Sequence, residues 1–256
     1  GTTNAHALTV DQAILTTPTS GAGGTVILES SGAITLTAGN SGTITTTGGG
    51  ANAGGEVFIH HTSAGAADIT LGKAITAKGG SGGNGAVVTV LNDSGNILVN
   101  HTIDVSLGVA GTTDGTIQLQ ASGSITDNAT GKLVGDTNGK LLAKTTATSG
   151  AANISLLGNG TNAATTNNAM ASAVFATATT GNGSVKYYDS TDLTIGTVGG
   201  AGVLNTPAGV TAGTAVVSTS GVSTLGGGTT NGAVTIAVGT TNAHALTVDQ
   251  AILTTP

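Results

Sequence analysis

Hydrophobic and polar residues alternate along this chain in short segments that return at a nearly constant distance. Four such segments begin their apolar positions at Val26, Val57, Val88 and Ile117, which follow one another at almost equal intervals. Alternation with a period of two places every second side chain on one face of a β-strand. Each segment is therefore predicted to be a strand with one apolar face.

Two more alternating segments follow each of these strands before the pattern returns. The second segments contain Ile34 and Leu36, Ile69 and Leu71, Ile97 and Val99, and Ile125; the third contain Ile44, Ile75, Ile103 and Leu133. Gly, Asn, Ser and Thr residues between the segments are typical of turns. Three short strands and three turns in about 30 residues predict one coil of a β-solenoid.

The fold class that this pattern predicts is all-β, a triangular parallel β-helix. Its coils should stack so that equivalent apolar residues form columns inside the solenoid. The first expected columns are Val26, Val57, Val88 and Ile117, and Leu28, Ile59, Val90 and Leu119. The spacing is less regular over residues 140–212, where strand-like segments persist. Within it, residues 161–173 do not alternate and predict a loop on one corner or a short helical turn.

A second, much longer repeat frames the chain. Residues 1–18 and residues 239–256 have the identical sequence GTTNAHALTVDQAILTTP. This predicts a tandem array in which residues 1–238 are one complete repeat and residues 239–256 begin the next; an engineered duplication is the alternative. Residues 1–256 are then one continuous solenoid segment of a very large protein.

Composition and charge exclude several classes of protein. The chain has 44 Gly but only 3 Pro, without the strict Gly spacing that a collagen triple helix needs. Its six basic residues are all Lys and its net charge is −6, so no basic face for nucleic acid is expected. No apolar run in the sequence is long enough for a membrane-spanning helix, so we expect no membrane insertion by a helix.

Some segments resemble the coils of filamentous-haemagglutinin-type adhesins, large bacterial surface proteins exported by the two-partner or autotransporter routes. The similarity lies in residues 24–39, GTVILESSGAITLTAG, with Gly123-Ser-Ile-Thr126 and Gly95-Asn-Ile-Leu98, and extends over most of residues 5–135 and 213–256. The resemblance implies a right-handed parallel β-helix, an extracellular or cell-surface location, and a role in attachment or fibre formation. It carries over no catalytic motif.

Few residues have the grouping that catalysis or ligand binding needs. The acids Asp68, Asp93, Asp104, Asp114, Asp127 and Asp136 are scattered, unlike the clustered carboxylates of β-helical pectin-degrading enzymes. Asp189 and Asp192, beside Lys186, Tyr187 and Tyr188, could form a small carbohydrate-contacting patch; a solvated turn with ordinary surface residues is the favoured interpretation.

The remaining candidates are histidines, a glycine-rich stretch and a surface spot. His60 and His61 are adjacent, so on a regular strand they face opposite ways and cannot bind one metal ion; His6 and His101 have no obvious partner. Residues 79–85, GGSGGNG, lack the Lys-Ser/Thr of a phosphate-binding loop. Ile27 and Phe58 share an outward column with Thr89 and Gln118, which predicts a small exposed apolar spot.

The sequence therefore predicts no catalytic, cofactor-binding or metal-binding residue. We expect an extracellular structural or adhesive fibre segment without enzymatic activity. Its expected partners are further copies of itself, joined end to end or through lateral fibre contacts, and glycans or the surfaces of host or neighbouring cells. A carbohydrate-binding or carbohydrate-cleaving β-helix domain, and a sheath or filament subunit that stacks head to tail, are the alternatives.

Overall fold

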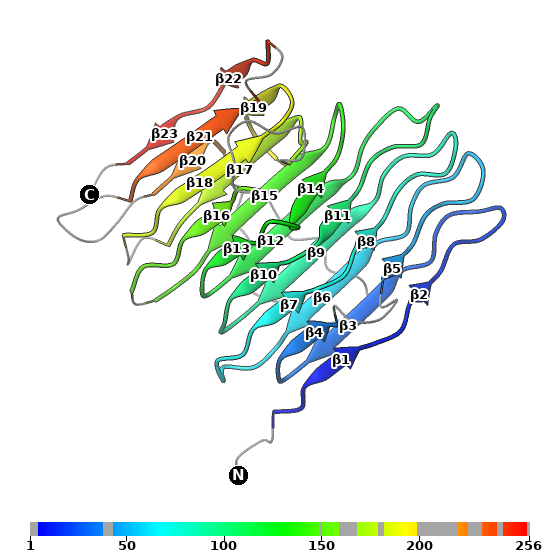
Figure 1. Ribbon diagram of the computed structural model, residues 1–256, viewed down its shortest axis with the longest axis horizontal. Coiled ribbons are helices and arrows are strands. Elements are labelled where there is room, and N and C mark those ends of the chain that lie inside the picture. Colours follow the sequence, from blue (N-terminus) through cyan, green and yellow to red (C-terminus); the bar gives the residue numbers. More distant parts are fainter. Residues whose placement is uncertain are drawn as a thin grey trace.

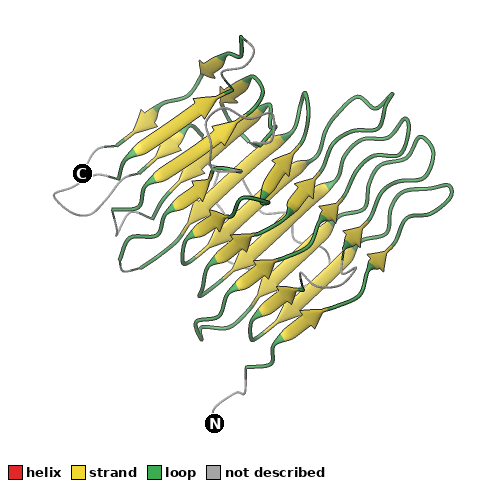
Figure 2. Ribbon diagram, viewed as in Figure 1, coloured by secondary structure: helices red, strands yellow, loops and turns green. Residues whose placement is uncertain are grey.

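The chain forms three parallel β-sheets, and successive strands visit the sheets in turn (Figure 1). This computed structural model describes residues 5–37, 43–148, 150–158, 168–178, 182–198, 220–224, 232–239 and 243–254. These residues contain strands and loops and no helix (Figure 2), so none of them forms a helix that could cross a membrane. The predicted fold class, an all-β triangular parallel β-helix, is confirmed.

The first side of the solenoid is an eight-stranded sheet. Its strands, in spatial order, are β1 (Leu8–Val10), β4 (Ile34–Leu36), β7 (Ile69–Leu71), β10 (Ile97–Val99), β13 (Ile125–Asp127), β16 (Ile154–Leu156), β18 (Val185–Asp189) and β21 (Val234–Val238). The second side is a shorter, five-stranded sheet. It contains β2 (Ile14–Leu15), β5 (Ile44–Thr45), β8 (Ile75–Thr76), β11 (Thr102–Asp104) and β14 (Lys132–Val134).

The third side is a ten-stranded sheet. Its main path runs through β3 (Val26–Ser30), β6 (Val57–His61), β9 (Val87–Asn92), β12 (Thr116–Ala121), β15 (Lys140–Thr145), β17 (Ser172–Ala176), β19 (Leu193–Ile195) and β22 (Leu246–Val248). β20 (Val222–Ser223) also pairs with β17, and β23 (Ile252–Leu253) pairs with β20. The sheet therefore divides at β17.

Strand register confirms the predicted columns. Val26 pairs with Val57, Val57 with Val88 and Val88 with Ile117, and the neighbouring column from Leu28 to Leu119 stacks in the same way. On the eight-stranded sheet, one unbroken inner column runs through Leu8, Ile34, Ile69, Ile97, Ile125, Ile154, Val185 and Val234. Since alternate residues point inward, these aliphatic side chains form one continuous core.

Glycine allows the chain to turn into the ten-stranded sheet. A Cβ on Gly85 would lie 1.8 Å from the carbonyl oxygen of Val105, and one on Gly115 would lie 1.8 Å from that of Ala86. Backbone from the adjacent coil occupies the space that any side chain would need. The Gly residues that precede the predicted strands therefore permit close contact between coils at this corner.

The less regular region begins where the five-stranded sheet ends. After β14, the described residues continue that side of the solenoid only through single bridges, from Val134 to Ala169 and from Asn168 to Asp189. Of the predicted loop at 161–173, residues 161–167 lie outside the described residues. The other end of that range already contains the two bridging residues and the first two residues of β17.

An insertion explains the division of the ten-stranded sheet. β19 pairs with the first residues of β17 and β20 with its last residues, so the two short strands together occupy one side of a coil. The chain leaves β19 and returns to β20 through a narrow neck, closed by an antiparallel bridge between Thr197 and Ser220 and a 2.9 Å hydrogen bond from Gly221 N to Gly196 O.

The predicted exposed apolar spot is wrong for one of its two residues. Ile27 is 40% exposed, but Phe58, its neighbour in the register, is only 1% exposed and packs edge-on against His60. Further along the same outer face, Leu91, Leu142 and Val174 form a small buried cluster with Val198 from the neck. Alternation in the sequence identified the outward face but gave no sign that later parts of the chain would pack on it.

Candidate functional site

The carbohydrate-contacting patch, the less favoured interpretation of this stretch, does not form, and the favoured interpretation, a solvated turn of surface residues, is wrong for Tyr187 and Asp189. Tyr187 and Asp189 both point into the solenoid and are buried, and the Tyr187 hydroxyl donates a 2.6 Å hydrogen bond to Asp189 Oδ2. Lys186 is exposed on the opposite face of the strand, and Asp192 lies on a separate exposed turn. Strand alternation therefore separates residues that are adjacent in the sequence.

A buried polar cluster replaces aliphatic packing at this corner. The Asp189 carboxylate accepts hydrogen bonds from the backbone N–H of Met170 and Thr191 and from the Thr191 hydroxyl, besides the one from Tyr187. Burial raises the pKa of Asp189, and these hydrogen bonds oppose that effect. Burial and the nearby carboxylate raise the pKa of Tyr187 well above its usual range, so the phenol remains a donor.

Asn168 completes this cluster and was not identified from the sequence. Its side-chain oxygen accepts from Leu133 N at 2.9 Å, and its amide donates to the backbone oxygens of Leu156 and Tyr188, both at 3.0 Å. One side chain thus bonds three separate coil segments where the five-stranded sheet has ended. The only signal in the sequence is the loss of alternation before residue 173.

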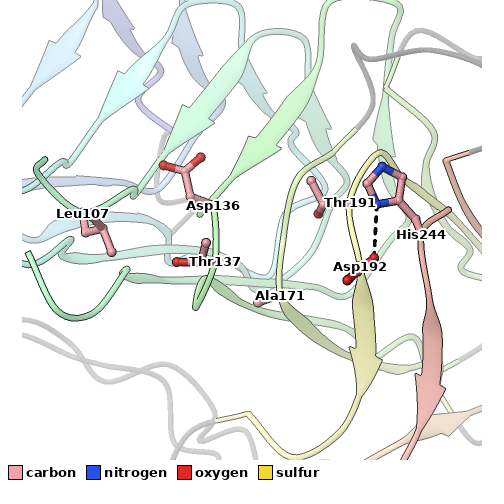
Figure 3. Close-up of a pocket in the computed structure, with 7 residues that line it drawn as sticks. All are labelled: Leu107, Asp136, Thr137, Ala171, Thr191, Asp192 and His244. Carbon is pink, nitrogen blue, oxygen red and sulfur yellow. Dashed lines mark hydrogen bonds and ion pairs between the residues drawn. The ribbon is translucent and has the colours of Figure 1, made fainter. Parts of the chain in front are cut away.

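A cleft with a volume of about 610 Å³ lies at the corner that leads into the ten-stranded sheet (Figure 3). Its lining residues are Leu107, Asp136, Thr137, Ala171, Thr191, Asp192 and His244. Asp136 lies on one side, and Asp192 and His244 on the other. Carboxylate groups therefore line this cleft on two facing sides.

The two carboxyl groups of the cleft differ in their surroundings. Partial burial raises the pKa of Asp136, and the negative charges of Asp114 and Asp104 add to that effect. Asp192 accepts hydrogen bonds from Ala245 N at 2.9 Å and from His244 Nδ1 at 3.1 Å, and these lower its pKa. The cleft therefore offers hydroxyl and carboxyl groups that could hydrogen-bond a polar ligand.

The two adjacent histidines face different neighbours, as predicted. His60 points outward and lies between two carboxylates, with Nδ1 3.4 Å from Glu29 and Nε2 3.0 Å from Asp93. The His61 Nδ1 is 3.1 Å from the side-chain oxygen of Asn92. Within the described ranges, no group of three or more His, Asp or Glu side chains is placed to hold a metal ion.

The other candidates make local hydrogen bonds or hydrogen bonds between coils. His101 accepts a hydrogen bond from the N–H of Thr102, and His6 uses its backbone N–H toward Ser31. In the glycine-rich stretch 79–85, the N–H groups of Gly79 and Gly80 donate to carbonyl oxygens of neighbouring coils. These N–H groups are therefore not free to bind a phosphate.

The scattered acids do not form one group. Asp68 accepts two hydrogen bonds from Asn96 in the next coil, and Asp93 contacts His60. Asp104 pairs with Lys78 at 3.4 Å, and Asp114 accepts from Leu107 N and Asn138 N, both at 2.6 Å.

Asp127 occupies an inward position. It pairs in register with the core residue Val99, and the carboxylate accepts a hydrogen bond from Gly158 N at 2.6 Å. Desolvation by burial raises the pKa of Asp127 from 3.8 to about 6. From the sequence, Asp127 was only one of several scattered acids, and its inward position beside Val99 was not identified.

Comparison with protein families, with curated proteins and with solved structures finds no match to this chain.

Proposed function

We propose that this chain is a structural or adhesive segment of an extracellular fibre, part of a giant repetitive bacterial surface protein, and has no catalytic activity. The observation that carries the proposal is the uninterrupted stacking of parallel strands along one axis, with the identical segments 1–18 and 239–256 at the two ends of the chain. A solenoid grows by adding coils, so its natural product is a long rod.

The side chains of the surface support this proposal. All four aromatic residues of the chain lie in the described part; Phe58, Phe175 and Tyr187 are buried, and Tyr188 is half-buried. The outer faces of the strands instead carry many Thr residues, as in the outward row of Thr9, Thr35 and Thr70. Hydroxyl-bearing β-branched residues favour strands and remain soluble, which suits a long exposed rod.

Immunogold electron microscopy on intact cells that produce the parent protein tests the proposal. Antibodies raised against residues 1–256 should label thin unbranched threads outside the cell without permeabilisation. Label that appears only after permeabilisation, or only on compact particles, would contradict it. The mass of the intact parent chain then separates one long polypeptide from a sheath of stacked subunits.

The cleft favours a second candidate, a carbohydrate-binding segment. Asp136, Thr137, Thr191 and Asp192 present hydroxyl and carboxyl groups to one hollow, and such groups hydrogen-bond sugar hydroxyls. A glycan array probed with the chain and with Asp136→Asn tests it: binding that the substitution weakens supports a glycan site, and equal binding excludes this cleft. A parallel turnover assay on polyuronates tests for cleavage, and clear turnover would refute the proposal that the chain is not an enzyme.

A further inference from the structure

The segment that occurs twice, as residues 1–18 and 239–256, takes two different places in the fold. In the first copy, β1 belongs to the eight-stranded sheet and β2 to the five-stranded sheet. In the second copy, the same residues form β22 and β23, and both belong to the ten-stranded sheet. We infer that these are two halves of one junction, through which consecutive repeats join into an unbroken solenoid while the sheets exchange sides. The inference rests on the proposed fibre in one respect, that repeats follow one another.

The two copies use complementary backbone groups. In the first copy, the strand bonds to the following coil through Leu8 N, which donates to Ala33 O, and Val10 O, which accepts from Thr37 N. In the second copy, the strand bonds to the preceding coil through Ala245 O and Asp249 N. Those two residues correspond to Ala7 and Asp11 of the first copy. Since backbone groups of successive residues point to opposite edges of a strand, one strand can make both sets of bonds at once.

The second strand of the segment follows the same rule. In the first copy, Ile14 N and Thr16 N donate to carbonyl oxygens of the following coil. In the second copy, the carbonyl oxygens of Ala251 and Leu253 accept from the preceding coil. These correspond to Ala13 and Leu15, which alternate with the two donors. Neither strand uses the same backbone group twice.

In each copy, the inward apolar side chains have a stacking neighbour on one side and lack one on the other. Val248 is 50% exposed at the end of the solenoid, whereas Val10, the same position in the first copy, is 8% exposed under the next coil. Val248 stacks on Ile195, and Val10 on Leu36. Joined at this residue, the two columns become one continuous aliphatic column. Burying these end residues favours the stacked arrangement.

The junction changes which sheet each column belongs to. β19 and β20 lie end to end along β17, and through β22 and β23 they lead into the eight-stranded and five-stranded sheets of the next repeat. The two strands that pair with β17 therefore begin two different sides of the triangular solenoid in the next repeat. β21 is the remaining strand of the last coil, and β3 of the next repeat would pair with it. The eight-stranded sheet of one repeat would then continue into the ten-stranded sheet of the next.

A two-repeat chain, residues 1–256 followed directly by residues 19–256, tests the inference with a disulfide. The protein has no Cys, so Thr247→Cys at the junction and Thr35→Cys in the second repeat introduce a single pair. In the first copy, the equivalent residues Thr9 and Thr35 are direct register partners. Neighbouring strands lie about 4.8 Å apart, within the Cα separations that a disulfide spans. The control pair combines Thr247→Cys with Thr126→Cys in the second repeat, three strands farther along the same outer row.

We expect mild oxidation to cross-link the junction pair at least about ten-fold more than the control pair. Equal cross-linking of the two pairs would overturn the inference. Small-angle scattering of the unsubstituted two-repeat chain gives a second readout that no substitution can disturb: one straight rod supports the junction, and two rods joined by a flexible hinge refute it. A hinged chain could still be an extracellular thread, so this failure is distinguishable from failure of the fibre proposal, which cell-surface labelling measures.

Discussion

Replacing Asp127 by Asn should make the protein more stable at neutral pH. The carboxyl group points inward, in register with the core residue Val99, and it accepts backbone hydrogen bonds from Leu157 and from Gly158, the latter at 2.6 Å. An Asn side chain has the same shape, and its amide oxygen can still accept hydrogen bonds from these backbone N–H groups. The substitution therefore removes a partly buried negative charge and keeps the packing.

The size and the sign of the effect follow from the shifted pKa of Asp127. Burial raises this pKa from 3.8 to about 6 in the folded chain, so between those values the folded state binds more protons than the unfolded state. The free energy of unfolding then decreases as the pH rises through this interval and stays lower above it. One pKa unit corresponds to about 1.36 kcal/mol, so the charge destabilises the fold by at most about 3 kcal/mol at pH 7.

Urea unfolding of both proteins between pH 3.5 and 8, about half a unit per step, measures this difference. The stability of the variant relative to the wild type should be nearly constant below pH 4, rise between pH 4 and 6, and level off above that. Asp11→Asn is the matched control, since Asp11 is exposed on the turn after β1 and should show no such rise. A difference between Asp127→Asn and the wild type that does not depend on pH would refute the reasoning.

Three further substitutions and one control test the packing between coils. Ile97→Ala removes a fully buried side chain from the inner column of the eight-stranded sheet, and thermal unfolding should show a loss of about 2–5 kcal/mol. Gly85→Ala places a Cβ 1.8 Å from Val105 O, so it should abolish the cooperative transition seen by circular dichroism. Gly65→Ala, whose nearest neighbour is a side-chain oxygen at 3.6 Å, should leave that transition unchanged. Asn168→Ala leaves three backbone groups without their partner, and its urea midpoint should fall by an amount equivalent to about 2–4 kcal/mol; an unchanged midpoint would show that water replaces the amide.

Local alternation was sufficient to predict the strands and the columns but not the chemistry of the candidate sites. Tyr187 and Asp189 lie in a polar stretch of sequence that suggests a surface turn, yet both are buried because the chain crosses that corner without a strand of the five-stranded sheet. The cleft has the same origin. Its two sides come from Asp136 and Asp192, which are separated along the chain by two further passages around the solenoid.

The amino-acid sequence by itself determined the period, the inward aliphatic columns and the parallel stacking. Each of these depends on contacts between equivalent positions of successive coils, and equivalent positions carry similar residues. Only the tertiary structure decided where a side of the triangle ends, that the outward residue Phe58 is buried, and which sheet the segment 239–256 joins. Those outcomes depend on how parts of the chain that are distant in sequence pack against one another. Two identical segments can therefore join different sheets, because their neighbours differ.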